Sequence, residues 1–477
     1  MMHFIHTNIR MCLFLVSFLF ISNEYRSQIN DTLTFLEFRE FVLTNHPVYR
    51  QALLQKAKGE STIQSARGNF DPKIEAGIQQ KYFRDQDYYN LNSASLKIPT
   101  QSPIELKAGF DKNSGAYFNP ENKTPNEGLL IAGASMPLLQ GLIMDERRAA
   151  LRQAQAFYGY SLAQQKIIVN NLLLSAYNQY WAWAAAFERV RISESIYTIS
   201  RDRFRAVRER ASFGDLAVID TLEAFTQQQQ RFQIFQEMRI GEIKERLLLS
   251  SFIWNSDTSE NVGVILNESI APEPYSELTE GYSELLLQKM NLINDIETTN
   301  PLLAQYEWKF KSLSIEEKLK KEKLKPKVNI NYNFLSESIS ENANTNFSMN
   351  NYKWGLDFSF PILLRQGRGD LKLTRIKILE TELELQKKTQ DVTNKVRLLF
   401  ETADILINQL TIARSNQKNY ETLLFGERDK FFSGESSLFM VNQREQQFAE
   451  SQFKVVDIQY KSQITANELS FQLGIIE

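Results

Sequence analysis

The stretch Lys325-Pro326-Lys327-Val328-Asn329-Ile330-Asn331-Tyr332-Asn333-Phe334 decides the fold. From Val328 to Phe334 apolar and polar residues alternate, so a strand here places Val, Ile, Tyr and Phe on one face and three Asn on the other. Pro326 ends the helical stretch that precedes it, and that stretch opens at Asn300-Pro301. A helix followed by an alternating strand is therefore the basic unit of this chain.

The same unit occurs earlier in the chain. Asn45-His46-Pro47 opens a helical stretch that ends near Asp71-Pro72-Lys73, and the spacing from Pro47 to Pro72 equals that from Pro301 to Pro326. Each half continues with a strand that ends on proline, a long helical stretch, a glycine and a second helical stretch. This ordered series predicts an internal duplication. The predicted parts are a first repeat, 28–254, an equatorial linker region, 255–299, and a second repeat, 300–477.

The alternating segments have the properties of membrane strands. They are predicted within about 73–137 and 327–361, and an apolar outer face with aromatic residues near its ends is typical of a transmembrane barrel. Ordinary sandwich strands with one wet face are the alternative. The stretch 88–112 has no counterpart in the second half and is predicted to add a hairpin to the sheet. The aromatic residues predicted to face lipid are Tyr332, Phe334, Tyr352, Trp354, Phe358 and Phe360.

Two very long helical hairpins are predicted, over 142–252 and 368–473. From Leu142 to Ala211 there is no proline and only one glycine, Gly159. Seventy helical residues would extend over roughly 105 Å, far beyond an average globular helix. In the second copy, apolar residues step by four and three along the helix, which indicates a coiled-coil seam. That seam comprises Val392, Val396, Leu399, Ala403, Leu406, Leu410 and Ala413.

The first residues indicate export. Arg10 precedes the apolar run Met11–Ile21, which has the length of a signal peptide, and cleavage is expected near residue 27. A short membrane anchor is the alternative. Without this segment the chain loses Cys12 and keeps one histidine, His46, which excludes disulfides, thiol catalysis and Cys-based zinc sites. No catalytic site, metal or cofactor is expected, and 55 basic against 57 acidic residues give no footprint for nucleic acid.

These features together resemble the TolC-like family of outer-membrane efflux proteins, over about residues 30–475. The resemblance is carried by Ser135–Gly141 with Asp145–Arg148, by Phe213–Ala224 and by Phe432–Asn442. It implies an α+β membrane protein, a homotrimer in which each chain gives four strands to a shared transmembrane β-barrel. A long α-helical coiled-coil tunnel would continue that barrel in the periplasm.

The resemblance also implies a passive exit duct in the cell outer membrane, serving a tripartite efflux or type I secretion system. Its partners would be a periplasmic adaptor, an inner-membrane transporter and outer-membrane lipid. A non-pore periplasmic or surface coiled-coil scaffold is the alternative, and an enzyme is not expected.

Two sets of site residues follow from the resemblance. The glycine-containing turns between the two helices of each hairpin, called the glycine tips, would contact the adaptor. Glycine also ends a helix for purely conformational reasons. The resemblance also implies that rings of acidic residues, just beyond the second glycine tip, constrict the pore. In this chain one of the matching positions holds Asn442 instead of an acid, and the acidic pair, Asp220 and Glu223, lies in the first copy. Asp220 would also suit the first turn of a helix, where an acid favours the helix dipole. The adaptor-contact residues are Gly214, Asp215, Leu216, Gly434, Glu435, Ser436, Ser437 and Leu438. The candidate constriction residues are Asp220, Glu223, Asn442 and Glu445.

Overall fold

The computed structural model describes residues 32–117, 119–255, 262–274, 293, 295, 296, 298–337 and 347–475. The predicted signal peptide and much of the predicted linker region lie outside these residues. Contacts divide the chain into two compact units, each with segments from both halves of the sequence. The first comprises Met1–Phe41, Gln179–Glu277 and Tyr420–Val456; the second comprises Val42–Asn178, Leu278–Asn419 and Asp457–Glu477.

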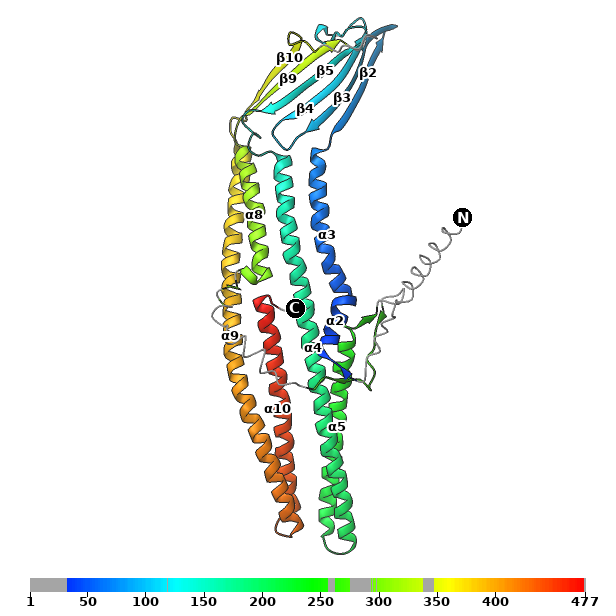
Figure 1. The fold of residues 1–477 in the computed structure, drawn as a ribbon, viewed down its shortest axis with the longest axis vertical. Coiled ribbons are helices and arrows are strands. Elements are labelled where there is room, and N and C mark those ends of the chain that lie inside the picture. The colour runs from blue at the N-terminus through cyan, green and yellow to red at the C-terminus, as the bar shows by residue number, and fades with distance from the viewer. Residues whose placement is uncertain are drawn as a thin grey trace, which may run out of the picture. The chain divides into compact units, whose positions relative to one another are not determined.

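The second unit contains a six-stranded, fully antiparallel sheet with the strand order β10-β9-β5-β4-β3-β2 (Figure 1). Strand β5 from the first half pairs directly with β9 from the second, so one sheet joins both halves. The edges are β2 and β10. The strands are β2 Lys73–Phe83, β3 Gln86–Pro99, β4 Glu105–Ser114, β5 Leu129–Pro137, β9 Lys327–Glu337 and β10 Tyr352–Ser359.

Six strands per chain correct the four that the family resemblance implies. The additional pair is β3 and β4, which lie between β2 and β5 and pair with both. The stretch 88–112 supplies most of their residues. These residues join the sheet as strands because their alternating pattern continues the two faces of the neighbouring strands. The predicted extra hairpin therefore extends this sheet.

One face of the sheet, called the apolar face below, carries apolar residues on all six strands. The register aligns Ile74 on β2 with Leu96 on β3, and further along aligns Ala134 on β5 with Tyr332 and Trp354. Many of these side chains are open; Ile74 is 82% exposed and Trp354 61% exposed. The opposite face carries lysine, asparagine, serine and acidic residues on five strands, whereas β5 places Leu129 and Ile131 there. The two-faced pattern of membrane strands is thus clear on five strands, including the additional hairpin, and weak on β5.

Both helices that lead into the sheet begin at a proline, α3 (Pro47–Arg67) and α8 (Pro301–Glu322). Proline suits the first helical position because its missing N–H would have no helical partner there. Asn300 Oδ1 accepts from the backbone N–H of Leu302, and His46 Nδ1 accepts from that of Val48 at 3.2 Å. Burial lowers the pKa of His46, which favours the neutral ring that this cap requires.

The long helices are α4 (Glu146–Ser212) and α9 (Arg365–Phe432). Helix α4 starts four residues later than predicted, because the carbonyls of Gly141 and Leu142 accept hydrogen bonds from the Arg148 side chain instead of entering the helix. In the second unit, α4 is approached closely by both proline-opened helices. A Cβ on Gly59 of α3 would lie 2.9 Å from Tyr158, and a Cβ on Gly159 would lie 2.4 Å from the ring of Trp308 on α8.

The predicted seam on α9 is buried. Val396 is fully buried, and of the seven seam residues only Leu410 is not classed as buried. Its partners in the core include Leu303 of α8 and Leu469 and Leu473 of α10 (Leu438–Leu473). The apolar stepping therefore correctly identified the packed face of this helix.

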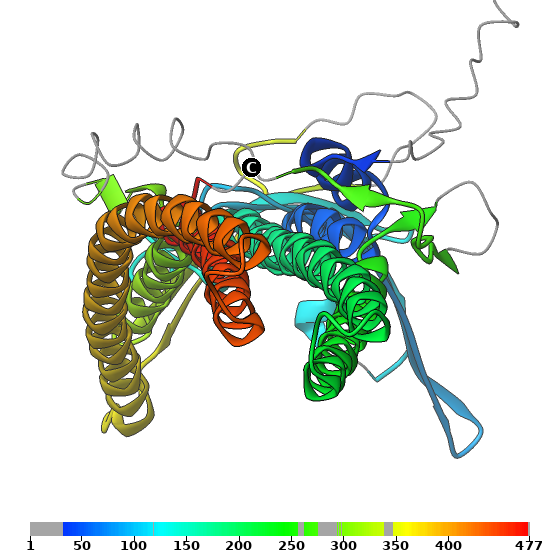
Figure 2. The ribbon, with the colours of Figure 1, turned by 90° about the horizontal axis from the view of Figure 1, so that it is seen from below.

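In the first unit, the lower part of α4 packs against α5 (Val218–Ser250), and Figure 2 shows these helices from below. Tyr197 stacks on Phe235 with centroids 6.0 Å apart. A short parallel pair of strands, β1 (Thr32–Leu33) with β8 (Ala271–Pro272), lies against α4. The hydroxyl of Tyr180 donates to the carbonyl of Leu33 at 2.9 Å and accepts from the N–H of Glu273 at 3.2 Å.

In the described part of the chain, no helix carries an apolar stretch long enough to cross a membrane.

Candidate functional site at the helix tips

The two glycine tips, both in the first unit, have the same backbone geometry. Gly214 has φ +84° and Gly434 has φ +80°, the left-handed conformation that favours glycine at a helix end. At the first tip the N–H of Asp215 donates to the carbonyl of Arg210 at 3.0 Å. At the second, the N–H of Glu435 donates to that of Lys430 at 2.8 Å. Both α4 and α9 are therefore closed by the same capping motif.

The predicted adaptor-contact residues lie at these turns. Gly214, Asp215, Gly434, Glu435 and Ser437 are exposed, and Leu216 and Ser436 are half-buried. Leu438 differs from them, being buried against Val207 and Ala224.

Large apolar side chains around the tips are open to solvent. Phe213 and Val218 are each 82% exposed, and Phe432 is 77% exposed. Apolar side chains of this size gain free energy when a partner covers them. A cavity of about 380 Å³ nearby is lined by Val207, Phe431 and other residues from α4, α9 and α10. Sequence reasoning did not identify these side chains, because it looked for the turn residues themselves.

Three of the four predicted constriction residues meet in one cluster. Glu445 of α10 forms ion pairs with Arg203 of α4 and with Arg428 of α9, the latter at 2.7 Å. Asn442 accepts from the Arg203 guanidinium and donates to Glu223 of α5 at 3.1 Å. The cluster thus ties together all four helices that end at the tips.

The cluster is largely withdrawn from solvent. The side chain of Glu445 is 8% exposed and that of Arg203 15% exposed. Burial lowers the pKa of Arg231 on α5, while the charge of Glu445 raises it. Glu445 thus pairs directly with two guanidinium groups and interacts electrostatically with a third, that of Arg231.

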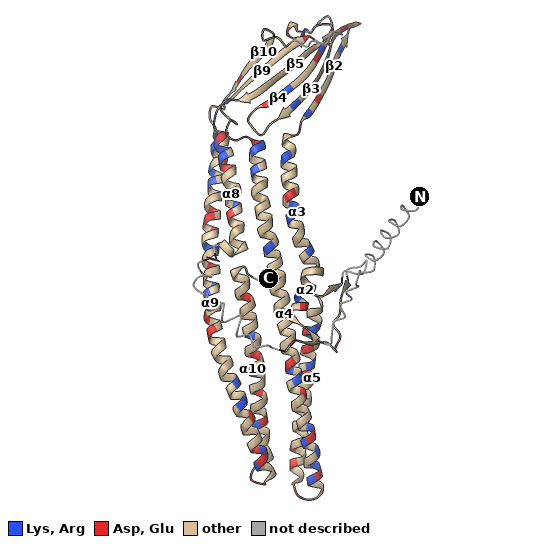
Figure 3. Ribbon diagram, viewed as in Figure 1, with Lys and Arg blue, Asp and Glu red and all other residues tan. Residues whose placement is uncertain are grey.

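Asp220 is not part of this cluster. It is half-buried in the first turn of α5, where a carboxylate favours the positive end of the helix dipole. Whether these four residues constrict a pore remains a prediction, because a constriction would be formed by more than one chain. What the structure adds is that Asn442 and Glu445 hold the helices of a single chain together. Charged residues of both signs are frequent along the lower parts of α5 and α10 (Figure 3).

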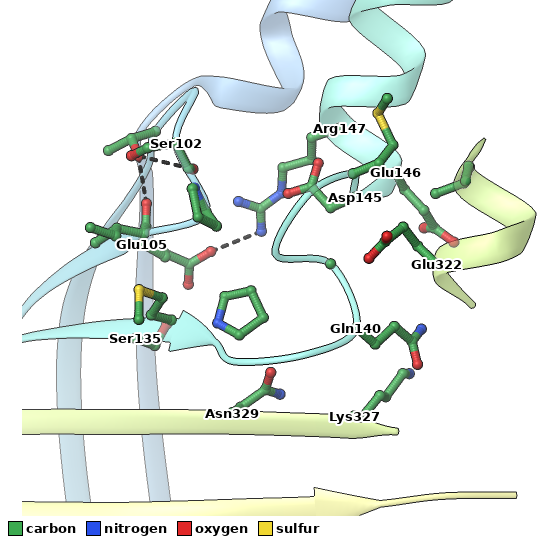
Figure 4. A pocket seen from close by; sticks show the side chains of 18 of the residues that line it. Ser102, Glu105, Ser135, Gln140, Asp145, Glu146, Arg147, Glu322, Lys327 and Asn329 are labelled. Atoms are coloured by element: carbon green, nitrogen blue, oxygen red, sulfur yellow. Dashed lines mark hydrogen bonds and ion pairs between the residues drawn. The ribbon is translucent and has the colours of Figure 1, made fainter. Parts of the chain in front are cut away.

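A second cavity, of about 500 Å³, lies in the second unit where the sheet meets its helices (Figure 4). Four of its charged groups form two pairs. Arg147 donates to Glu105 at 2.8 Å, and Lys323 lies 2.6 Å from Glu146. The Lys323 partner lowers the pKa of Glu146 through a hydrogen bond and through its charge. These pairs hold the start of α4 against strand β4 and against the end of α8.

No group of His, Cys, Asp and Glu side chains among the described residues could hold a metal ion.

The predicted lipid-facing aromatics share the apolar face of the sheet. Tyr332 lies opposite Trp354, Phe334 opposite Tyr352, and Phe358 opposite Val328. Phe360 follows the last residue of β10 and is 38% exposed. The rings of Tyr332 and Tyr352 stack at 5.8 Å, which gives the face a continuous aromatic surface.

Comparisons with known proteins point to one kind of molecule. Residues 292–475 match the model of a family described as outer membrane efflux protein. The fold matches the Vibrio cholerae outer membrane protein VceC, with a TM-score of 0.63 and 11% identity over 92% of this chain and 95% of that chain. It also matches the Campylobacter jejuni outer membrane channel CmeC, with 0.61 and 12% over 92% and 85%.

A third match is the open state of the Neisseria gonorrhoeae outer membrane channel MtrE, with a TM-score of 0.59 and 13% identity over 92% of this chain and 89% of that chain. No curated protein sequence matches the chain. At these identities the solved structures establish the fold, whereas the family match is a property of the sequence itself.

Proposed function

We propose that this chain, whose residues 292–475 belong to the outer membrane efflux protein family, is the exit duct of a tripartite efflux or type I secretion system. The resemblance seen in the sequence is confirmed by that family match and by the shared fold. The protein is an outer-membrane channel for efflux, with a helical part in the periplasm. It moves its cargo passively, and partners supply the energy.

The observation that carries this function is the sheet with one apolar and one polar face. A scaffold protein has no use for large open apolar side chains on one face of strands β2, β4, β9 and β10, because water would surround them. In a bilayer the same face contacts lipid, and the polar face lines an aqueous lumen. This arrangement favours the channel over the coiled-coil scaffold.

The sheet of one chain cannot stand alone in lipid. Its edge strands β2 and β10 carry unpaired backbone groups, which a bilayer core does not tolerate. The strands β2 and β10 run in opposite directions, so β10 of one chain can pair antiparallel with β2 of the next. We infer a homotrimer whose shared barrel has eighteen strands, six from each chain. Because barrel diameter grows roughly linearly with strand number, this pore is about 1.5 times as wide as one with twelve strands.

A cysteine crosslinking and conductance experiment tests the pore. Gly355→Cys on β10 is combined in turn with Glu75→Cys, Gly77→Cys and Gln79→Cys on β2, and a short bismaleimide is added to protein in outer-membrane vesicles. We expect crosslinked dimers and trimers for at least one pair, and stepwise conductance of the purified protein in planar bilayers. The matched control places cysteines on the inner strands β4 and β9, at Lys107 and Asn331, which should crosslink no chains together. Purified protein that forms no pores would refute the channel.

We further propose that the tips are the docking surface for the periplasmic adaptor. The support is that the turn residues and the apolar side chains beside them, such as Phe213 and Phe432, are exposed together at the ends of both helical hairpins. Alanine in place of Phe213 and Phe432 would remove a large part of this apolar surface without removing a packed core side chain.

Photocrosslinkers at Asp215 and Glu435 are expected to capture the adaptor in cells, and the yield should fall several-fold when Phe213 and Phe432 are alanine. A crosslinker at Tyr82, at the far end of strand β2, is the control and should capture no adaptor. Capture at the strand with none at the tips would overturn the docking proposal.

A further inference from the structure

Four lysines lie in a single register row on the polar face of the sheet. Starting from the β2 edge, each residue of the row is the direct cross-strand partner of the next. The row runs through Lys73, Lys97, Lys107, Gly133, Asn333 and Lys353. We call its charged members, Lys73, Lys97, Lys107 and Lys353, the lysine row. No acidic residue belongs to it.

The lysine row is short of counter-charge. Lys97 Nζ lies 2.6 Å from Glu75 Oε2, and Glu75 also interacts electrostatically with Lys73 and Lys107. One carboxylate thus serves three ammonium groups. Within the described part of the chain, Lys97 is the only member of the row with a carboxylate at ion-pair distance.

Other acids on the polar face stand apart from the row. Asp111 and Asp357 are each four residues along their strands from the nearest row lysine, about 13 Å at the usual rise per residue. Asp357 accepts from the amide of Asn331 at 2.9 Å. Glu105 pairs with Arg147 at 2.8 Å, so its charge is already balanced.

Like charges in such a row destabilise the sheet. Neighbouring strands lie about 5 Å apart, and like charges directly opposite one another are unfavourable. Lys73, Lys97 and Lys107 nevertheless face each other across three strands, two of which belong to the additional hairpin. The polar face could have accommodated asparagine or serine, as it does on β9 and β10. A feature that costs folding free energy and remains exposed points to a role in binding.

We propose that the lysine row makes the pore wall attract anions, so that the channel conducts small anions and anionic solutes in preference to cations. This inference rests on the proposed pore, which places the polar face toward the lumen. Because strands in a barrel are tilted, the row of each chain climbs the wall as a slanted stripe. Unpaired ammonium groups along that stripe raise the local anion concentration, as rings of Lys and Arg do in anion pores.

The test measures the reversal potential of the full-length trimer in planar bilayers under a KCl gradient. We expect a chloride-to-potassium permeability ratio above unity. Gln in place of all four row lysines should lower that ratio by roughly 2- to 10-fold. Arg in place of the same four should preserve it, and Glu75→Gln should raise it. Lys112→Gln is the matched control, because Lys112 is exposed on strand β4 but lies on the apolar face.

The outcomes separate the inference from the proposed function. Conducting pores with no anion preference, or a preference that the Gln variant retains, would overturn the anion-attracting wall and leave the channel intact. A loss of preference in Lys112→Gln as large as in the row variant would also overturn it. Protein that never conducts would refute both.

Discussion

Replacing Glu445 with alanine is expected to destabilise the helix tips by about 3–5 kcal/mol. The substitution removes the carboxylate shared by Arg203 and Arg428 and leaves their guanidinium groups, on side chains 15% and 26% exposed, without this counter-ion. The loss should be local, because Glu445 lies near the ends of the helices it connects. Hydrogen exchange measured by mass spectrometry should show faster exchange in peptides covering 198–212 and 424–450, with strands β2–β5 unchanged.

The matched control is Asp202→Ala. Asp202 is the neighbour of Arg203 on the same helix and pairs with Arg205 at 3.6 Å, but its side chain is 58% exposed. An exposed pair contributes about 0–1 kcal/mol, so exchange at the tips should barely change.

Replacing Glu445, Arg203 and Arg428 together by methionine should restore much of the protection, because the two guanidinium groups that paired with Glu445 are removed with it. Slow exchange in the Glu445→Ala variant would show that the cluster does not hold the tips. Under the proposed function, the loosened helices should also give the single variant a larger conductance than the triple variant.

The long-range partners of this cluster explain what sequence reasoning could not supply. Arg203 and Asn442 are 239 residues apart along the chain, and no periodicity within one helix reveals which residues of another helix it will meet. Glu445 and Asn442 are predictable only through the family pattern that they match. Their partners on α4 and α9 have no signal in the sequence beyond the fact that an acid on the packed side of a helix requires a cation.

The starts and ends of helices, in contrast, are predictable from the sequence. Pro47 and Pro301 start helices, and Gly214 and Gly434 follow the ends of α4 and α9. These residues act through their own backbone geometry, so their effect does not depend on distant contacts.

Strand alternation was equally informative, because side chains on a strand alternate whatever the strand pairs with. The number of strands is harder to predict from the sequence. Four strands were expected from the family, whereas the pattern in 88–112 already indicated two more. The six-stranded sheet shows that this local pattern was the better guide. The lysine row was invisible in the sequence, since it depends on the register between strands that are far apart in the chain.

Among the helical glycines, Gly159 is the one at which adding a side chain is expected to cause the largest steric clash. It is the only glycine in the predicted helical stretch 142–211, and the structure supplies the reason. The side chain of Trp308 on α8 covers its Cα, and a Cβ there would lie 2.4–2.6 Å from three atoms of the indole. These atoms belong to the rigid ring system, so the whole tryptophan or the helix carrying it must move.

Gly159→Ala is therefore expected to destabilise the second unit by roughly 1–3 kcal/mol, even though alanine favours a helix by about 1 kcal/mol over glycine. Thermal unfolding followed by circular dichroism in detergent should show a lower midpoint. Gly241→Ala on α5 is the matched control. No atom beyond its own helix turns lies within 4 Å of a Cβ built there among the described residues. Its midpoint should stay level or rise, because only the helix propensity changes.

Trp308→Leu combined with Gly159→Ala completes a double-mutant cycle. The smaller side chain makes room for the new methyl group, so the alanine should cost less in the double variant than in the wild-type background. A Gly159→Ala protein that melts as high as Gly241→Ala would show that α4 and α8 are not held at this distance. An alanine cost that is the same with and without Trp308 would assign the effect to another neighbour.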